Sequence, residues 1–294
     1  MTATASAEKG RDFGAEVVAL PLPWRVAAAA LKVFARGSLL AMVAALLFSD
    51  EPPTNPLAQM RMFAGLFLAP EAAAWCVARA FAARLTVRNG LIVLEQRAQR
   101  AEIRIQALAS VEPWTLPLPA NGLSLRLDSG ALFGDGIVMA DPASFVAALT
   151  AQGGKRSLGD ALEGRAILYT KARLANPRGI FENPLLKFVL FPLVPALPAF
   201  RLHQYITYGG TFGEYQTFGL KAYLLALAIW WISWAIGLVL FAAVLRMFIE
   251  AGTILAVFLQ PAWAAVTRRI LEIVGRVLYY LGIPAWLLIR LWPW

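Results

Sequence analysis

The feature that most constrains this chain is the stretch from Ala222 to Leu245, which carries no charged side chain. As a helix it is long enough to cross the roughly 30 Å hydrocarbon core of a bilayer. The whole chain is similar: 59% of its 294 residues are hydrophobic and only 15% are charged, whereas about a quarter are charged in a typical soluble domain. The sequence therefore predicts a polytopic membrane protein and excludes a cytosolic enzyme, a disordered chain and a disulfide scaffold.

The charge balance predicts which parts face the cytoplasm. The net charge is +9, and residues 83–184 alone hold 12 Lys and Arg, a bias typical of cytoplasmic segments and headgroup contacts. Nucleic-acid binding is not expected, because the basic residues are spread along the chain without a recognised module. The first 22 residues lack the layout of a signal peptide, so we expect a cytoplasmic N-terminus.

Composition divides the chain into five parts. We expect a cytoplasmic tail at 1–22, two membrane helices at 23–83, a β domain at 84–152, a basic cytoplasmic connector at 153–184, and a C-terminal membrane region with broken and interfacial helices at 185–294. Three prolines within 185–200 favour a re-entrant dip there over a full span. A return span is expected from Gly252 to Val266. With the dip, Arg246–Glu250 lies outside, whereas Arg268–Arg276 lies inside, with Arg269, Glu272 and Arg276 on one helical face.

From Arg84 onward the hydrophobic period changes from 3.6 to two. Asn89-Gly90 lies between two apolar segments and is the strongest short hairpin signal in the chain. A two-residue turn at this position pairs Val87 with Ile92, Leu85 with Leu94 and Arg84 with Glu95. Further short strands are expected up to Ala140, followed by one helix that Asp141 caps and Pro142 begins.

Consecutive antiparallel strands closed by one helix resemble the bacterial pleckstrin-homology-like domains of membrane proteins. The resemblance covers residues 84–152 and rests on the segments LTVRNGLIVLE, EIRIQALASVEPW, GLSLRLDSG and DPASFVAAL. The position directly after two membrane helices is also similar to that group. The resemblance implies a binding or assembly module. Phosphoinositide binding is not expected, because the first strand loop is only Asn89-Gly90 and holds no cluster of Lys and Arg.

Glu71 is the first candidate for a functional residue. It follows Pro70 inside the second predicted span, and an ionisable side chain near mid-membrane is a candidate for an ion or proton pathway. The alternative is that Pro70 breaks the helix and that Glu71 is hydrated at the break. Both interpretations remain open.

The second candidate is the segment 201–221, which holds His203, the only histidine of the chain, together with Tyr208 and Glu214. A histidine beside a carboxylate can perform general acid–base catalysis, and the glycines of the segment let backbone approach a ligand closely. The preferred alternative is an interfacial loop whose tyrosines and histidine lie at the level of the lipid headgroups.

No cofactor or metal is predicted, because single copies of Cys76 and His203 allow neither a cysteine cluster nor a paired-histidine site. The expected fold is an α+β membrane protein: a transmembrane helix bundle with an inserted small antiparallel β-barrel-like domain closed by one helix. The expected function is a binding, scaffold or assembly factor of the bacterial inner membrane, with lipids and a membrane protein as partners. The alternatives are a membrane-embedded enzyme acting on a lipid-like substrate at 201–221, and a transporter component using Glu71.

Overall fold

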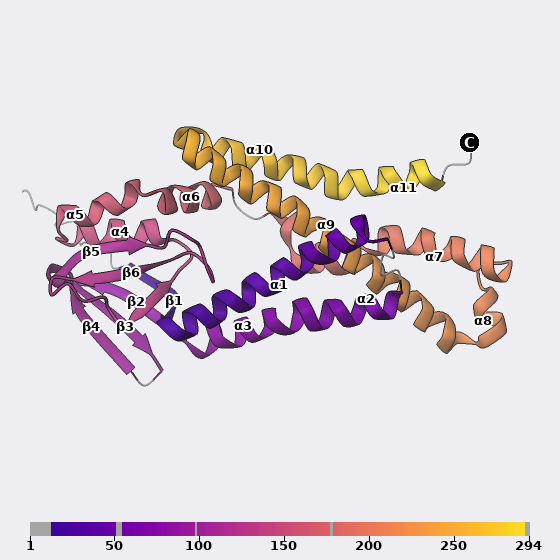
Figure 1. Ribbon diagram of the computed structural model, residues 1–294, viewed down its shortest axis with the longest axis horizontal. Helices are drawn as coiled ribbons and strands as arrows, with labels where there is room; N and C mark the ends of the chain where they lie inside the picture. The colour runs from indigo at the N-terminus through magenta and orange to yellow at the C-terminus, as the bar shows by residue number, and fades with distance from the viewer. Residues whose placement is uncertain (1–12, 51–54, 98, 177–178, 292–294) are drawn as a thin grey trace, which may run out of the picture. The chain divides into compact units, whose positions relative to one another are not determined.

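The computed structural model describes residues 13–50, 55–97, 99–176 and 179–291 (Figure 1). The beginning of the expected tail and part of the proline-rich turn after the first helix lie outside these residues. The chain divides into two compact units, which are described separately. The first comprises residues up to Val33, Glu71–Ala175 and Ala256–Ala264, and the second comprises Phe34–Pro70, Asn176–Leu255 and Ala265–Trp294.

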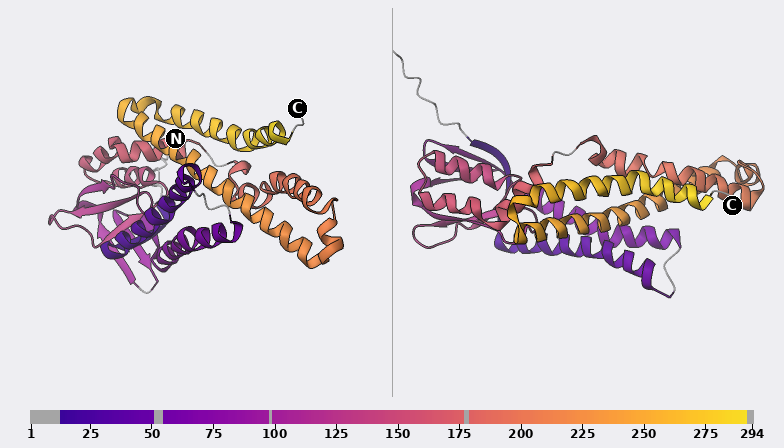
Figure 2. Two further views of the ribbon diagram at one scale, coloured as in Figure 1. Left: turned by 45° about the vertical axis from the view of Figure 1, so that its right-hand side comes forward. Right: turned by 90° about the horizontal axis from the view of Figure 1, so that it is seen from above.

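The first unit is built on a sheet of seven antiparallel strands, in the order β4-β3-β2-β1-β7-β6-β5, which curls into a half-barrel (Figures 1 and 2). The strands are β1 (Phe13–Pro21), β2 (Ala82–Arg88), β3 (Leu91–Gln96), β4 (Gln99–Arg104), β5 (Leu108–Pro113), β6 (Gly122–Leu127) and β7 (Asp135–Val138).

The predicted hairpin is confirmed in every pair. Arg84 lies opposite Glu95, Leu85 opposite Leu94 and Val87 opposite Ile92. Asn89 and Gly90 adopt φ values of 50° and 73°, which the two central residues of a type I′ turn require. Short-range turn chemistry and the period of two therefore fix this register without help from the rest of the chain.

The central strand of the sheet comes from a part of the chain that we expected to be a tail. Strand β1 pairs with β2 on one side and with β7 on the other. Its alternate residues Val17 and Ala19 are 3% and 0% exposed, so one face of the strand is buried as the period of two requires. The tail assignment of residues 13–21 is thus corrected, and the β domain is assembled from two segments separated by the helical stretches 22–48 and 56–80.

Helices cover one face of the half-barrel. They are α4 (Pro142–Ala151), α5 (Arg156–Gly159), η3 (Asp160–Glu163) and α6 (Arg165–Leu174). As predicted, Asp141 caps α4 by accepting from the backbone N–H groups of Ala143 and Ser144. Phe145, Val146 and Leu149 of this helix are fully buried against the sheet, which closes the domain core.

The two central strands continue directly into apolar helices. Strand β1 ends at Pro21, where α1 (Leu22–Phe48) begins, and β2 begins at Ala82, just after α3 (Ala69–Ala80) ends. The backbone N–H of Ala19 donates to the carbonyl of Phe81 at 3.0 Å. The rings of Trp24 and Phe81 pack at 5.7 Å between centroids. Because no linker separates strand from helix, the sheet fixes where both helices begin.

Trp114 joins the first turn of α1 to the sheet. The guanidinium of Arg25 lies 3.8 Å from the centre of the indole ring, within the range of a cation–π interaction. The indole N–H donates to the hydroxyl of Ser124 at 3.0 Å. The ring lies over Gly122 and Gly136, where an added Cβ atom would come within 2.7 Å and 2.5 Å of it. Glycine at both positions is therefore what leaves space for the indole.

The remaining helical elements range from single short turns to a helix of 40 residues. They are α2 (Pro56–Phe63), η1 (Ala64–Leu68), η4 (Ile180–Glu182), η5 (Leu186–Leu190), α7 (Leu193–Tyr208), α8 (Gly213–Phe218), α9 (Leu220–Leu259), η6 (Pro261–Trp263), α10 (Ala264–Val277), η7 (Leu278–Gly282) and α11 (Ile283–Leu291). Five helical stretches among the described residues are long and apolar enough to cross a membrane: 22–48, 56–80, 186–208, 220–259 and 261–289.

Of the expected helix breaks, one is present in these stretches and two are absent. The helix over 56–80 continues through Pro70, because a π-helical turn at Ala64–Leu68 precedes the proline and accommodates the missing N–H donor. The stretch 186–208 keeps the expected break: a turn at Phe191 and Pro192 separates η5 from α7. Its two parts together are long and apolar enough to cross a membrane. Helix α9 runs for 40 residues without the turn expected after Leu245. Arg246 and Glu250 support it as an i,i+4 ion pair.

In the second unit, apolar side chains of three helical segments share a core. Its buried members are Leu39 and Met42 of α1 and Ile236 and Leu240 of α9, and the aromatic residues Phe63 and Phe67 pack against them. This small core joins the second half of α1 to the α2–η1 segment and to the middle of α9.

We predict that the β domain folds only with β1. Without this strand, residues 82–175 leave β2 and β7 without their shared neighbour and expose the buried core beneath Val17 and Ala19. A soluble chain in which residues 13–21 are joined to 82–175 by a short Gly/Ser linker is expected to unfold cooperatively in thermal circular dichroism. Residues 82–175 alone are expected to show no cooperative transition. Equal cooperative melting of the two chains would contradict the central role of β1.

The glycine slot under Trp114 gives a second prediction. In the full chain, Gly136→Ala places a methyl group against the indole and should cost about 1–3 kcal/mol of unfolding free energy by overpacking. Gly134→Ala is the matched control, because nothing lies within 4 Å of the added Cβ atom at that position. Thermal unfolding in mild detergent measures both, and equal stability of the two variants would show that the slot is not close-packed.

Candidate functional site

The segment 201–221 forms a helical turn between α7 and α9. Gly209 ends α7 in the left-handed conformation at φ 74°, and the short helix α8 follows. Gln204 is fully buried, and its amide N–H donates to the carboxylate of Glu214 at 2.6 Å. The backbone N–H of Glu214 donates back to the amide oxygen of Gln204 at 3.1 Å. This reciprocal pair uses Glu214 to hold the turn together.

His203 lies in a separate group of contacts. Its Nδ1 is 3.2 Å from the hydroxyl of Thr207, and its ring packs against Trp230 at 5.3 Å and against Tyr208 at 6.3 Å between centroids. The structure thus brings together His203 and Tyr208, two of the predicted candidates. The hydrogen bonds of Glu214 go to Gln204 instead, so the geometry assigns Glu214 a structural contact.

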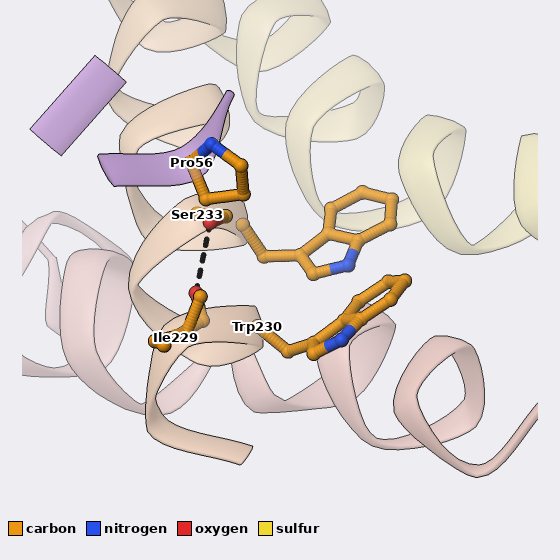
Figure 3. A pocket seen from close by; sticks show the side chains of 5 residues that line it. Pro56, Ile229, Trp230 and Ser233 are labelled. Carbon is orange, nitrogen blue, oxygen red and sulfur yellow. Dashed lines mark hydrogen bonds between the residues drawn. The ribbon is translucent and has the colours of Figure 1, made fainter. Parts of the chain in front are cut away.

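The ring of Trp230 also lines an apolar cavity of about 260 Å³ (Figure 3). The other lining residues are Pro56, Ile229, Ser233 and Trp234. Trp230 and Trp234 are four residues apart on α9 and therefore share one helix face. The hydroxyl of Ser233 donates a hydrogen bond to the backbone carbonyl of Ile229 at 2.8 Å. A cavity of this lining suits an apolar group such as an acyl chain more than a polar metabolite.

A series of ion pairs connects three segments of the second unit. In order, the series consists of Arg246, Glu250, Arg268, Glu272, Arg276, Glu182 and Lys187, and every consecutive pair lies within 4.0 Å. Positive and negative groups alternate along it. Helix α9 supplies the first two residues, α10 the next three, and the segment around η4 and η5 the last two.

Arg268 is the centre of this ion-pair series. Its side chain is 1% exposed. It donates to both carboxylate oxygens of Glu250, at 3.0 Å and 3.2 Å, and to Glu272 at 2.9 Å. This fork geometry is the one in which a guanidinium satisfies two carboxylates at once. A buried charge in an apolar helix is tolerated only with such partners.

The ion-pair series overturns the expected membrane sides of these residues. Groups joined by hydrogen bonds near 3 Å cannot lie on opposite faces of a bilayer, so placing Arg246–Glu250 outside and Arg268–Arg276 inside was wrong. The helix face expected to carry Arg269 is also corrected, because Arg269 is exposed and Arg268 is the buried residue. The i,i+4 spacing of Arg268 and Glu272 is the sequence pattern that could have identified Arg268 as the paired, buried arginine.

The far end of the ion-pair series ties η4 to the C-terminal helix. Burial alone would raise the pKa of the Glu182 carboxyl, but Lys187 and Arg276 together hold this pKa below its ordinary value. The hydroxyls of Tyr279 and Tyr280 donate to the backbone carbonyls of Lys187 and Phe181, at 2.8 Å and 2.6 Å. Charge and aromatic hydrogen bonds therefore act together at this junction.

Glu71 lies in the first turn of α3, partly buried, inside the continuous helix over 56–80. The helix break that would have hydrated it is not present. Among the described residues, no group of three or more His, Cys, Asp and Glu side chains is arranged to hold a metal ion.

Comparisons with known proteins add no assignment to this geometry. No family model, no curated protein and no solved structure matched the chain.

We predict that the ion-pair series is required for stability because of Arg268. Arg268→Met removes the shared partner of two partly buried carboxylates and should cost about 3–5 kcal/mol, the usual penalty for breaking one side of a buried ion pair. Arg269→Met is the matched control, since the neighbouring arginine is exposed. Thermal unfolding of the full chain in detergent compares them. A similar small loss in both variants would contradict the role given to Arg268.

Proposed function

We propose that this protein is a polytopic protein of a bacterial inner membrane that acts as a binding, scaffold or assembly factor through a cytoplasmic, pleckstrin-homology-like β domain. The observation that carries the proposal is the direct continuation of β1 and β2 into apolar helices. Such a connection holds a small binding domain at a fixed height and orientation on the membrane. A domain that only needed tethering would be served by a flexible linker.

The helix lengths support a specific membrane topology. Strand β1 and the rest of the β domain lie on one side, because β1 and β2 are neighbours in one sheet and the chain between them forms two candidate spans. Helix α9 is about 60 Å long at 1.5 Å per residue, twice the hydrocarbon core. Its last turns reach α6, where Arg165 lies 4.4 Å over the ring of Phe258. The extra length of α9 is therefore placed on the side of the β domain.

This topology places the turn at 201–221 on the opposite side of the membrane from the β domain. Glu182 precedes the candidate span 186–208, and Lys187 lies at its start. Both belong to the same ion-pair series as Arg246 and Glu250. The chain therefore leaves from the side of the ion-pair series, turns at α8 and returns along α9. The β domain and His203 would then serve different compartments.

The proposal is tested by identifying the proteins that bind to the β domain. The tagged full chain is purified from its native membrane in mild detergent, and the copurifying proteins are identified by mass spectrometry. We expect a stoichiometric membrane-protein partner that is lost when residues 84–152 are replaced by a short Gly/Ser linker. Membrane fractionation confirms that the shortened chain still inserts.

The matched control keeps the β domain and changes the other candidate site. His203→Ala is expected to retain the partner. Loss of the partner in His203→Ala but not in the shortened chain would reject the proposal, as would a full chain that purifies without any stoichiometric protein.

A second candidate function rests on the contact between His203 and Trp230. Because Trp230 lines the apolar cavity, His203 lies where it could act on a lipid-like molecule whose chain occupies that cavity. Lipid analysis of the same purified samples distinguishes this candidate. A tightly bound lipid lost in His203→Ala favours it.

A further inference from the structure

We propose that the loop between β5 and β6, residues 114–121, rests in the lipid headgroup layer of the leaflet that α1 enters, and that it fixes the β domain flat against the bilayer. The proposal rests on α1 being a membrane helix. It adds a second, non-helical contact with lipid to the binding function above. The occupant of this surface is the bilayer itself, rather than a soluble ligand or a protein.

The first argument is the position of the loop relative to α1. The loop begins at Trp114, and the guanidinium of Arg25, in the first turn of α1, lies 3.8 Å from the centre of the Trp114 ring. Helix α1 has 27 residues and is about 40 Å long, some 10 Å more than the hydrocarbon core. Arg25, with Trp24 beside it, therefore belongs at the headgroup level, where basic and aromatic side chains concentrate. The base of the loop is held at that level.

The second argument is the chemistry of the loop. Its sequence, WTLPLPAN, carries no charge. Between residues 82 and 151, the described large apolar side chains that are exposed are Leu116, at 68%, and Leu132, at 52%. An uncharged loop that presents an exposed leucine enters a headgroup layer without desolvating a charge, and the leucine side chain gains free energy by leaving water.

The third argument is that the loop cannot move away from this position. The backbone N–H of Trp114 donates to the carbonyl of Gly122 at 3.0 Å, and that of Met139 donates to the carbonyl of Asn121 at 3.0 Å. Both ends of the loop are thus tied to the sheet. On α1, Leu22 and Val26 are 63% and 59% exposed, so the first turns of this helix also present apolar side chains.

Leu132 provides an internal comparison. It lies between β6 and β7, so β6 separates its loop from the loop of Leu116. Its loop begins at Asp128, which forms an ion pair with Lys155. Two leucines of similar exposure therefore occupy opposite ends of one strand, one beside the first turn of α1 and one beside a surface ion pair.

The test uses the full chain in vesicles of neutral phospholipid. In a Cys76→Ser background, Leu116→Cys and Leu132→Cys are labelled with an environment-sensitive fluorophore. Nitroxide groups on the upper acyl carbons of the lipid act as quenchers. We expect a blue-shifted emission and strong quenching at position 116, with a depth of about 5–10 Å into the boundary layer, and water-like, unquenched emission at position 132.

Two results would overturn the proposal: water-like emission at both positions, or a blue shift at 116 that the lipid nitroxides do not quench, which would place protein against the loop. Thr115→Cys, also on an exposed residue of the loop, replaces Leu116→Cys if the latter fails to fold. Vesicle flotation separates this failure from that of the topology, because a chain that does not float with lipid has no membrane helix at all.

Discussion

The pairing of β1 with β2 is the interaction on which the first unit depends. These two strands are neighbours at the centre of the sheet, and each continues without a linker into an apolar helix. An antiparallel pair fixes its two strands about 4.8 Å apart and in one register. The helices that continue from them therefore start at fixed positions. Trp114, held by Arg25, Ser124 and the two glycines below it, adds a second contact at the same junction.

This arrangement also has a consequence for the order of folding. The core of the β domain needs Val17 and Ala19 from the beginning of the chain and Leu85, Leu123 and Phe145 from the part that follows the helical stretch 56–80. Bringing two such distant segments together costs conformational entropy, and this cost grows only slowly with the length of the chain between them. The two helical stretches between β1 and β2 return the chain to the sheet, where the pairing of these strands joins the two distant segments.

In the second unit the comparable constraint is the burial of Arg268. Removing a guanidinium from water is expensive, and the attraction of its partners offsets that cost only when every donor finds an acceptor. Glu250 and Glu272 meet this condition from two helices. The remaining members of the ion-pair series continue the alternation of charge out to Lys187. Such a series contributes specificity. Two helices that meet only through apolar faces can shift along one another, whereas the ion pairs between α9 and α10 hold these helices in one register.

The sequence by itself determined the local features whose causes are local. The hairpin at Asn89-Gly90 follows from its turn and its period of two, and the start of α4 follows from Asp141 and Pro142. Long uncharged runs likewise determine long apolar helices. Tertiary structure alone decided the features that depend on partners far away in the chain. The small residues of β1 become a strand only between β2 and β7, and Arg268 is buried only because Glu250 reaches it. His203 and Glu214 are close in sequence, yet separate packing partners draw their side chains into different contacts.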